Sequence, residues 1–210
     1  AIITGIIIYN PAEVINTDFT RISNYLFWYK EQDLYKLSYL NQLISELNPL
    51  IQDFFLLCLS ETVREVSFTR NGEFKRYKMS EKQLEKFNPD VFNIFERKVQ
   101  RNIKGLEAFN TTGTENLASV YDFNTSNGIP SEVIEKDSVD MVITSPPYGD
   151  SHTTVAYGQF SRWANEWFGF DNAKIIDRLL MGGVISKEIK FSTISINSEL
   201  ENIKKLDEKR

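Results

Sequence analysis

The stretch DMVITSPPYGD, residues 140–150, decides the fold that we expect for this chain. It starts inside an apolar run over residues 139–144, predicted to be a short buried strand, and continues into two prolines, a tyrosine and a glycine. In open α/β sheets, ligands bind outside the carboxyl ends of the strands, so a reactive loop is expected directly after this run. Each proline fixes its own φ angle, and Pro147 also restricts Pro146. The loop is therefore predicted to be rigid and to hold its polar and aromatic side chains in fixed places.

Two further apolar runs are predicted to be strands of the same sheet. Residues 1–9, AIITGIIIY, are nearly all apolar and β-branched, which is typical of a strand covered on both faces in a parallel sheet. Residues 117–123 form another short apolar run, and residues 132–135 after it are expected to form a short helix or turn. This arrangement favours the α/β class.

Four segments have the apolar spacing of helices. The first begins at Leu34, and Asn48-Pro49 ends it while offering a cap and a first-turn proline for the second. Asn88-Pro89 repeats that signal before the third. The second helix is expected to bury Ile51, Phe54, Phe55, Cys58, Leu59, Thr62 and Val66. The apolar positions of the other three are Leu37, Leu40, Ile44 and Leu47; Val91, Phe92, Phe95, Val99, Ile103 and Leu106; and Phe160, Trp163, Ala164 and Trp167.

The composition fits one folded unit of 210 residues with a sizeable core. Its 41% hydrophobic content is typical of a soluble globular protein. Cys58 and His152 are the only cysteine and histidine, which excludes an internal disulfide framework and a zinc site built from nitrogen and sulfur ligands, so no metal is predicted. The apolar opening is too short to span a bilayer. We therefore expect a cytoplasmic protein without a membrane partner.

The charge of the chain is segregated along the sequence. The whole chain carries −5, which argues mildly against binding nucleic acid. Between Arg64 and Lys104, however, eleven Lys and Arg stand against six Asp and Glu, so this stretch carries +5 and the remainder −10. Salt limits the influence of each charge to about 10 Å, so a basic segment can follow a phosphate backbone whatever the total charge is.

The motif TSPPY at Thr144–Tyr148 resembles the catalytic motif of the DNA amino-methyltransferases, in the serine form typical of enzymes that methylate the N4 of cytosine. Adenine enzymes more often carry an acidic residue or asparagine where Ser145 stands. The longer runs TSPPYGDSHTTVAYGQFSRW at 144–163 and SETVREVSFTRNGEF at 60–74 are similar to one branch of bacterial modification methylases. With the segment between them, the resemblance covers most of residues 30–185.

The resemblance implies a partial Rossmann-like fold of the S-adenosylmethionine-dependent methyltransferases, which is an α/β fold. It assigns residues 1–17 and 111–210 to a partial catalytic domain. Residues 18–110 then form a helical insertion between the second and third strands, with a possible DNA-contacting region. Relative to the family, both ends of the chain are expected to be cut.

The chemistry of the reaction gives the residues of the motif definite roles. An exocyclic amine is a poor nucleophile because its lone pair is delocalised into the ring. Ser145 Oγ and the carbonyl oxygen of Pro146 could accept its two hydrogens and direct the nitrogen lone pair at the methyl donor, while Pro147 keeps the turn rigid. Tyr148 would stack on the base after it is flipped from the duplex. Alternatively, the motif is a proline turn between a strand and a helix, or a polyproline segment that another domain recognises.

Residues for the implied cofactor, S-adenosyl-L-methionine, are harder to find. Members of the family carry a glycine-rich loop after their first strand, and no such loop precedes Tyr148. The run GIIIYNPAEV at 5–14 is similar to their second strand, yet apolar residues and Tyr9 stand where the ribose-binding acid belongs. Asp122 is expected to accept a hydrogen bond from the adenine amine, and Thr144 is a weaker cofactor-binding candidate. An equal alternative for Asp122 is that it caps a turn.

A cluster of basic residues around the Asn71-Gly72 turn is the candidate DNA contact. It is expected to form a hairpin or a helix end, interleaved with Phe68, Phe74 and Tyr77, and a solvated basic face is the alternative. The basic residues are Arg64, Arg70, Lys75, Arg76 and Lys78. His152 is not expected to act as a general base, because N-methylation can release its proton to solvent.

Together these features predict a site-specific methyltransferase, or a fragment or subunit of one, that methylates cytosine N4 in double-stranded DNA within a restriction-modification system. One alternative is methylation of adenine N6 by the same loop, since serine does not exclude it. The other is a catalytically inactive remnant that binds DNA or a partner. A complementing methyltransferase chain that carries the glycine-rich loop would favour a split enzyme over a remnant.

Overall fold

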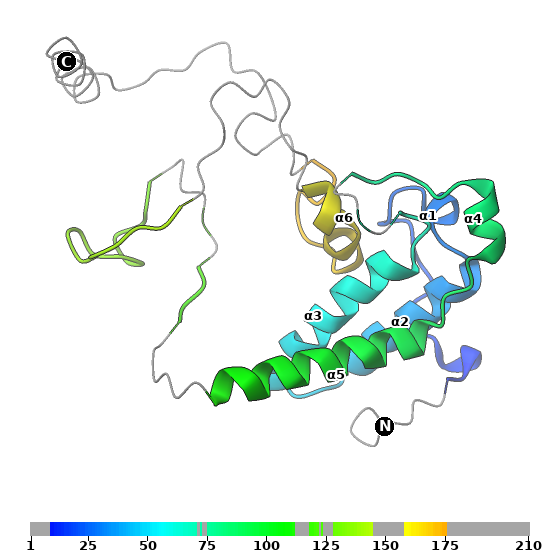
Figure 1. Cartoon of the computed structure of the whole chain (residues 1–210), viewed down its shortest axis with the longest axis horizontal. Coiled ribbons are helices and arrows are strands. Elements are labelled where there is room, and N and C mark those ends of the chain that lie inside the picture. Colours follow the sequence, from blue (N-terminus) through cyan, green and yellow to red (C-terminus); the bar gives the residue numbers. More distant parts are fainter. Residues whose placement is uncertain are drawn as a thin grey trace, which may run out of the picture.

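The computed structural model describes residues 9–70, 72, 75–111, 118–121, 123, 128–144 and 158–175. Within these residues the chain is folded mainly into helices (Figure 1). In chain order they are the 3-10 helix η2 (Pro11–Glu13), α1 (Tyr25–Trp28), α2 (Glu31–Ser45), α3 (Pro49–Val66), α4 (Glu81–Lys86), α5 (Val91–Asn110) and α6 (Gly158–Trp167). Among these described helices, none is both long and apolar enough to cross a membrane.

Capping side chains fix where α3 and α5 begin. The side chain of Asn48 accepts a hydrogen bond from a first-turn N–H at 2.9 Å, and Pro49 occupies the first helical position, as predicted. α5 begins two residues later than the Asn88-Pro89 signal predicted. Its cap is Asp90, because that carboxylate accepts a hydrogen bond from the N–H of Asn93 at 3.2 Å.

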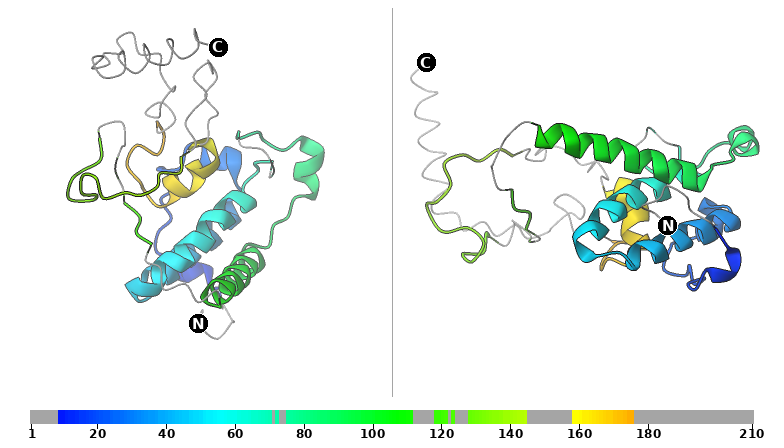
Figure 2. Two further views of the ribbon diagram at one scale, coloured as in Figure 1. Left: turned by 60° about the vertical axis from the view of Figure 1, so that its left-hand side comes forward. Right: turned by 90° about the horizontal axis from the view of Figure 1, so that it is seen from below.

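Helices α2, α3, α5 and α6 pack around one hydrophobic core. α3 contacts each of the other three, and it lies between α5 and α6 in Figure 1; Figure 2 shows the same neighbours from two other sides. The core contains Leu34, Leu37, Leu40 and Ile44 of α2, Cys58, Leu59, Val63 and Val66 of α3, Val91, Ile94 and Phe95 of α5, and Trp163 and Trp167 of α6. α6 therefore shares its core with the helices of the region 18–110.

The predicted burial holds over most of α3 and fails at the ends of the bundle. Ile51 in the first turn of α3 is 41% exposed, and its neighbour Leu50 is exposed as well. In α5, Leu106 is 52% exposed because the carboxyl-terminal half of the helix runs past α3 (Figure 1). The prediction is confirmed at Cys58, Leu59, Thr62, Val66, Val91 and Phe95. Helical spacing identifies the apolar face of a helix but not how far its neighbours extend.

The buried carboxylate of Glu166 ties α6 to the loop that precedes α1. It accepts hydrogen bonds from the backbone N–H of Ser23 at 2.6 Å and from the Ser23 hydroxyl at 3.0 Å. The Nε–H of Arg162, one turn earlier in α6, donates a third hydrogen bond at 2.6 Å. A buried charge is tolerated when it is paired and hydrogen-bonded, as here. These contacts hold the carboxyl-terminal half of α6.

The apolar runs that were predicted to be buried strands do not form strands where the structure describes them. Residues 118–121, 123 and 139–144 have no strand pairing, and the runs are largely exposed: Val120 is 98% and Ile143 89% exposed. A strand is stable only beside a hydrogen-bonded neighbour, and no described residue pairs with these segments. Most of the first predicted strand, residues 1–8, lies outside the described residues. The α/β fold class therefore stays a prediction.

Candidate functional site

The predicted catalytic loop lies outside the described residues. The residues concerned are Ser145, Pro146, Pro147 and Tyr148. Asp122 and His152 also lie outside them, whereas Thr144, directly before the loop, is described and exposed. The described structure resumes at Gly158, where α6 begins. The roles assigned to the loop residues stay predictions from the sequence.

The basic segment after α3 forms a short hairpin, one of the two forms predicted for it. The backbone N–H of Arg70 donates to the carbonyl of Tyr77 at 2.8 Å, and an antiparallel bridge pairs Thr69 with Lys78. At the turn, Gly72 has φ of +123°, in the region that favours glycine. The hairpin is fixed to the end of α1 because Phe68 N–H donates to the Trp28 carbonyl at 2.7 Å.

Arg64, at the carboxyl-terminal end of α3, points toward α6 and is only 6% exposed. Its Nη1 donates a hydrogen bond to the Phe160 carbonyl at 3.1 Å, and its guanidinium carbon lies 4.1 Å from the centroid of the Phe160 ring. Burial lowers the pKa of this guanidinium, which an aromatic face and a carbonyl still stabilise in its charged form. Because Arg64 is buried against α6, we leave it out of the DNA-contacting set proposed below.

Arg76, on the second arm of the hairpin, also contacts α6. Its backbone N–H donates to the side-chain oxygen Oε1 of Gln159 at 3.2 Å. Its guanidinium carbon lies 4.5 Å from the ring centroid of Trp163 and 5.8 Å from that of Trp28. Trp163 in turn donates from Nε1 to the hydroxyl of Thr69 at 3.0 Å. Two of the five basic residues predicted to contact DNA thus bind α6.

The other three basic residues predicted to contact DNA are Arg70, Lys75 and Lys78, and we call them the hairpin face. Arg70 and Lys75 are exposed, and Lys78 is half-buried. The guanidinium of Arg70 lies 5.2 Å from the ring centroid of Tyr77, and the ammonium of Lys78 lies 3.7 Å from that of Phe27. Cations beside exposed aromatic rings are suited to a phosphate backbone and to unstacked bases. Of the aromatic residues predicted to be interleaved with these cations, Tyr77 lies beside Arg70 and Phe68 beside Lys78, whereas Phe74 lies outside the described residues.

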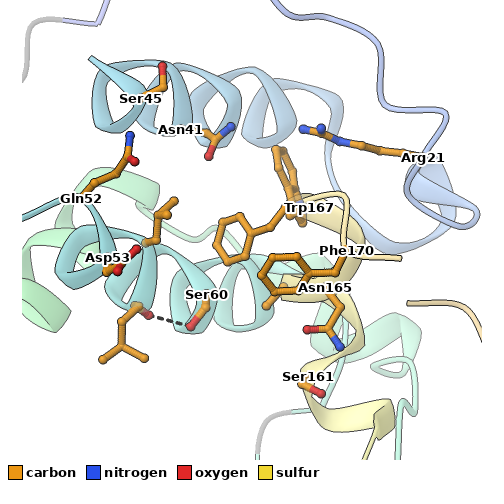
Figure 3. A pocket seen from close by; sticks show the side chains of 14 residues that line it. Arg21, Asn41, Ser45, Gln52, Asp53, Ser60, Ser161, Asn165, Trp167 and Phe170 are labelled. Atoms are coloured by element: carbon orange, nitrogen blue, oxygen red, sulfur yellow. Dashed lines mark hydrogen bonds between the residues drawn. The ribbon is translucent and has the colours of Figure 1, made fainter. Parts of the chain in front are cut away.

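An open groove of about 560 Å³ lies between α2, α3 and α6 (Figure 3). Leu56, Leu57 and Phe170 give it apolar walls, and the amide side chains of Asn41 and Asn165 stand on opposite sides of it. None of the described residues predicted to serve catalysis, cofactor binding or DNA contact lines this groove. The groove and the hairpin face are therefore separate features.

The two residues predicted to contact S-adenosylmethionine form no described site for it. Of the two predicted contacts, Thr144 is exposed at the end of an unpaired segment, and Asp122 lies outside the described residues. The apolar side chains before Thr144 are largely exposed, with Val142 and Ile143 among them.

Sequence reasoning found α6 but not its contacts. The spacing of Phe160, Trp163, Ala164 and Trp167 predicts the helix, and it is present as Gly158–Trp167. Nothing in that spacing pairs α6 with Arg64 or Arg76, which stand more than eighty residues earlier in the chain. The aromatic residues interleaved with the basic ones were the available signal for these internal contacts. A cation near aromatic residues in sequence is as well suited to a contact with an aromatic ring inside the protein as to a contact with DNA.

Comparison with known proteins finds one informative relative. The chain is 39% identical over 182 residues to the Type II methyltransferase M.MvaI of Kocuria varians. The match takes in 82% of this chain and 39% of that protein, so the chain spans about two fifths of its relative's length. No family model matches the chain, and no solved structure matches it. This chain is therefore homologous to part of a Type II methyltransferase.

Proposed function

We propose that this chain is part of a site-specific DNA methyltransferase of a restriction-modification system, and that the base it modifies is cytosine, at N4. The observation that supports this most strongly is the 39% identity to a Type II methyltransferase. A match that takes in 82% of the chain necessarily includes residues 144–148, whichever terminus it omits. The serine form of the TSPPY motif favours cytosine N4 over adenine N6.

In this proposal the loop holds the target base and aims its amine. Ser145 Oγ and the Pro146 carbonyl accept the two amine hydrogens, which directs the nitrogen lone pair toward the methyl donor. Tyr148 stacks on the flipped base and offsets part of an unstacking cost of a few kcal/mol. Pro147 restricts the backbone of Pro146 and so keeps its carbonyl oriented. The proton leaves to solvent after transfer, so no side chain of the loop has to act as a base.

The hairpin face supplies the contact to duplex DNA in this proposal. Arg70 and Lys75 are exposed cations on a short hairpin that is fixed to the helical core at Trp28 and Thr69. Phosphate contacts of this kind position a protein on the duplex without reading its sequence. The recognition sequence must then be read by other residues.

The methyl donor that we propose is S-adenosylmethionine, and we assign its binding mainly to a complementing polypeptide. Thr144, the described one of its two predicted contacts, is exposed, and the 210 residues of this chain contain no glycine-rich loop before Tyr148. This division gives the chain the base-holding half of the site. The activity then belongs to the complemented protein.

Nucleoside analysis after methylation tests this proposal. The chain is co-expressed with the part of M.MvaI that it does not match, incubated with duplex DNA and S-adenosylmethionine, and the digested DNA is analysed by mass spectrometry. N4-methylcytosine is the expected product. N6-methyladenine would support the adenine alternative instead. Binding of DNA without any methylated base would favour the inactive remnant and overturn the proposal.

A further inference from the structure

We propose that Leu26 and Phe27 of α1 form an apolar wedge that inserts between stacked base pairs of duplex DNA, and that Lys78 binds a phosphate beside the opened base step. This inference rests on the proposed function and deepens its DNA contact. It adds to that contact two residues that the sequence pattern did not single out. It also adds a distortion of the duplex, which phosphate contacts alone do not produce.

The first step is the exposure of two adjoining apolar side chains. Leu26 is 61% and Phe27 51% exposed, although Tyr29, directly after α1, belongs to the hydrophobic core. An exposed apolar residue that stands singly is ordinary, whereas adjoining ones beside a binding surface indicate a contact with another molecule. Leucine and phenylalanine are among the residues that DNA-bending proteins insert between base steps.

The second step is the attachment of α1 to the hairpin. The backbone N–H of Phe68 donates to the carbonyl of Trp28, the residue after Phe27, at 2.7 Å. The Phe27 ring packs edge-on against the Trp28 ring, with their centroids 5.0 Å apart. The N–H of Tyr29 closes the short helix by donating to the Tyr25 carbonyl at 2.9 Å. The wedge is therefore held in place before DNA binds, which lowers the entropy lost on binding.

The third step is the charge around the wedge. The ammonium of Lys78 lies 3.7 Å from the ring centroid of Phe27 and 5.5 Å from that of Phe68. The described residues of 24–30 and 67–80 include Lys and Arg but neither Asp nor Glu. Lys78 is also part of the hairpin face, so the wedge adjoins the surface proposed to bind DNA. This combination of exposed apolar side chains and cations favours DNA over an apolar protein surface as the occupant.

The fourth step is the consequence for the bound duplex. Insertion of the wedge replaces the contact between two stacked base pairs with contacts to Leu26 and Phe27, and it bends the DNA. A base beside a disturbed step is also easier to extrude from the duplex, which the proposed reaction requires. The cost of opening the step falls when the step is already weakly stacked. Weakly stacked DNA should therefore bind more tightly than fully paired DNA.

Affinity for two duplexes tests the wedge without any methyl transfer. The full chain is titrated by fluorescence anisotropy with a fully paired duplex and with the same duplex carrying a mismatch. The parent should bind the mismatched duplex about tenfold more tightly, because less stacking has to be broken. In a variant that combines Leu26→Ala with Phe27→Ala, the two affinities should agree within about twofold. Phe27→Trp keeps an aromatic ring and should retain the preference.

The opened step can also be observed directly in the parent. The fluorescence of 2-aminopurine rises when the base loses its stacking neighbours. In a series of paired duplexes that carry this base at successive positions, its signal should rise at one position when the parent binds. The signal should stay low with the double variant. A low signal at every position would overturn the wedge, whether or not the variant folds.

The matched control combines Leu50→Ala with Phe170→Ala. This variant loses a leucine and a phenylalanine that are 90% and 60% exposed elsewhere on the protein, and its preference should equal that of the parent. A preference for the mismatch that is absent from the parent, or that persists in the wedge variant, would overturn the wedge alone and leave the phosphate contacts of the hairpin face in place. If the parent binds neither duplex, the DNA contact of the proposed function fails together with the wedge.

Discussion

At the scale of single residues, replacing Ser145 distinguishes a role in orienting the amine of the target base from a role in binding DNA. Ser145→Ala removes one of the two acceptors for the amine hydrogens, and this orientation matters mainly at the transition state. We expect kcat of the complemented enzyme to fall about tenfold or more, while DNA affinity measured by fluorescence anisotropy changes less than about twofold. Equal losses in rate and affinity would indicate that Ser145 serves binding instead.

Asp33 gives the protein a pH dependence of stability that can be traced to one carboxylate. It is 1% exposed, neither carboxylate oxygen has a hydrogen-bond partner, and the Lys36 ammonium stands 3.6 Å away. Burial raises the pKa of Asp33 above its ordinary value of 3.8, and Lys36 offsets this only in part. The folded state therefore keeps its proton at a pH where the unfolded state has lost it, so stability falls as pH rises from about 4 through the folded pKa.

The variant Asp33→Asn should lack this fall in stability. Chemical denaturation of both proteins at pH 4 and pH 7 measures it. Relative to Asp33→Asn, the parent should lose free energy of unfolding as the pH rises, by about 1.4 kcal/mol for each unit by which the folded pKa is raised within that range. A difference between the two proteins that is the same at both pH values would show that Asp33 titrates normally.

At the scale of elements, the hairpin is expected to separate cations that bind DNA from cations that hold α6. Replacing both Arg70 and Lys75 by alanine should weaken binding to every duplex and flatten the salt dependence by up to about two units of slope, about 0.9 for each phosphate contact. Arg64→Ala should leave the slope unchanged and lower the melting temperature, because Arg64 is buried. Binding titrations at several salt concentrations check both expectations.

The control for the hairpin measurement is the pair of replacements Arg97→Ala and Arg101→Ala on α5. These cations are exposed and pair with Glu65 and Glu61 of α3, so the variant loses the same charge from another surface. Its salt slope should equal that of the parent. An equal loss of salt slope in both double variants would mean that DNA binding depends on the net charge of the protein alone. Unchanged DNA affinity of the hairpin variant would support the alternative that the segment is a solvated basic face.

The elements also show which parts of the structure follow from local sequence. The start of α3 follows from Asn48-Pro49, because a cap and a first-turn proline act within a few residues. α6 follows from its aromatic spacing. The contact of Arg64 with α6 could not be predicted from local sequence, because its partner Phe160 is distant in the chain. The runs at 117–123 and 139–144 have strand-like sequences, yet their described residues have no strand partner, and pairing depends on chain that is remote in sequence.

At the scale of the whole molecule, the chain by itself should bind S-adenosylmethionine weakly. No glycine-rich loop precedes Tyr148 in its sequence, and apolar residues and Tyr9 stand where the ribose-binding acid belongs in the run 5–14. Isothermal titration calorimetry of the isolated chain should show little or no binding, and affinity should appear when the complementing part of M.MvaI is added. A dissociation constant in the low micromolar range for the chain alone, about −8 kcal/mol of binding free energy, would contradict this expectation.

The measurement that tests the central claim most directly is the rate of methyl incorporation into duplex DNA with the loop intact and with the loop altered. The complemented enzyme is compared with its Tyr148→Ala and Tyr148→Phe variants, using labelled S-adenosylmethionine and a melting curve for each protein. Because base stacking is worth about 1–3 kcal/mol, Tyr148→Ala should lose most of the rate and Tyr148→Phe should keep much of it, with all three proteins equally folded. Incorporation at the parent rate by a folded Tyr148→Ala variant would contradict the catalytic role of this loop and leave a proline turn of structural purpose in its place.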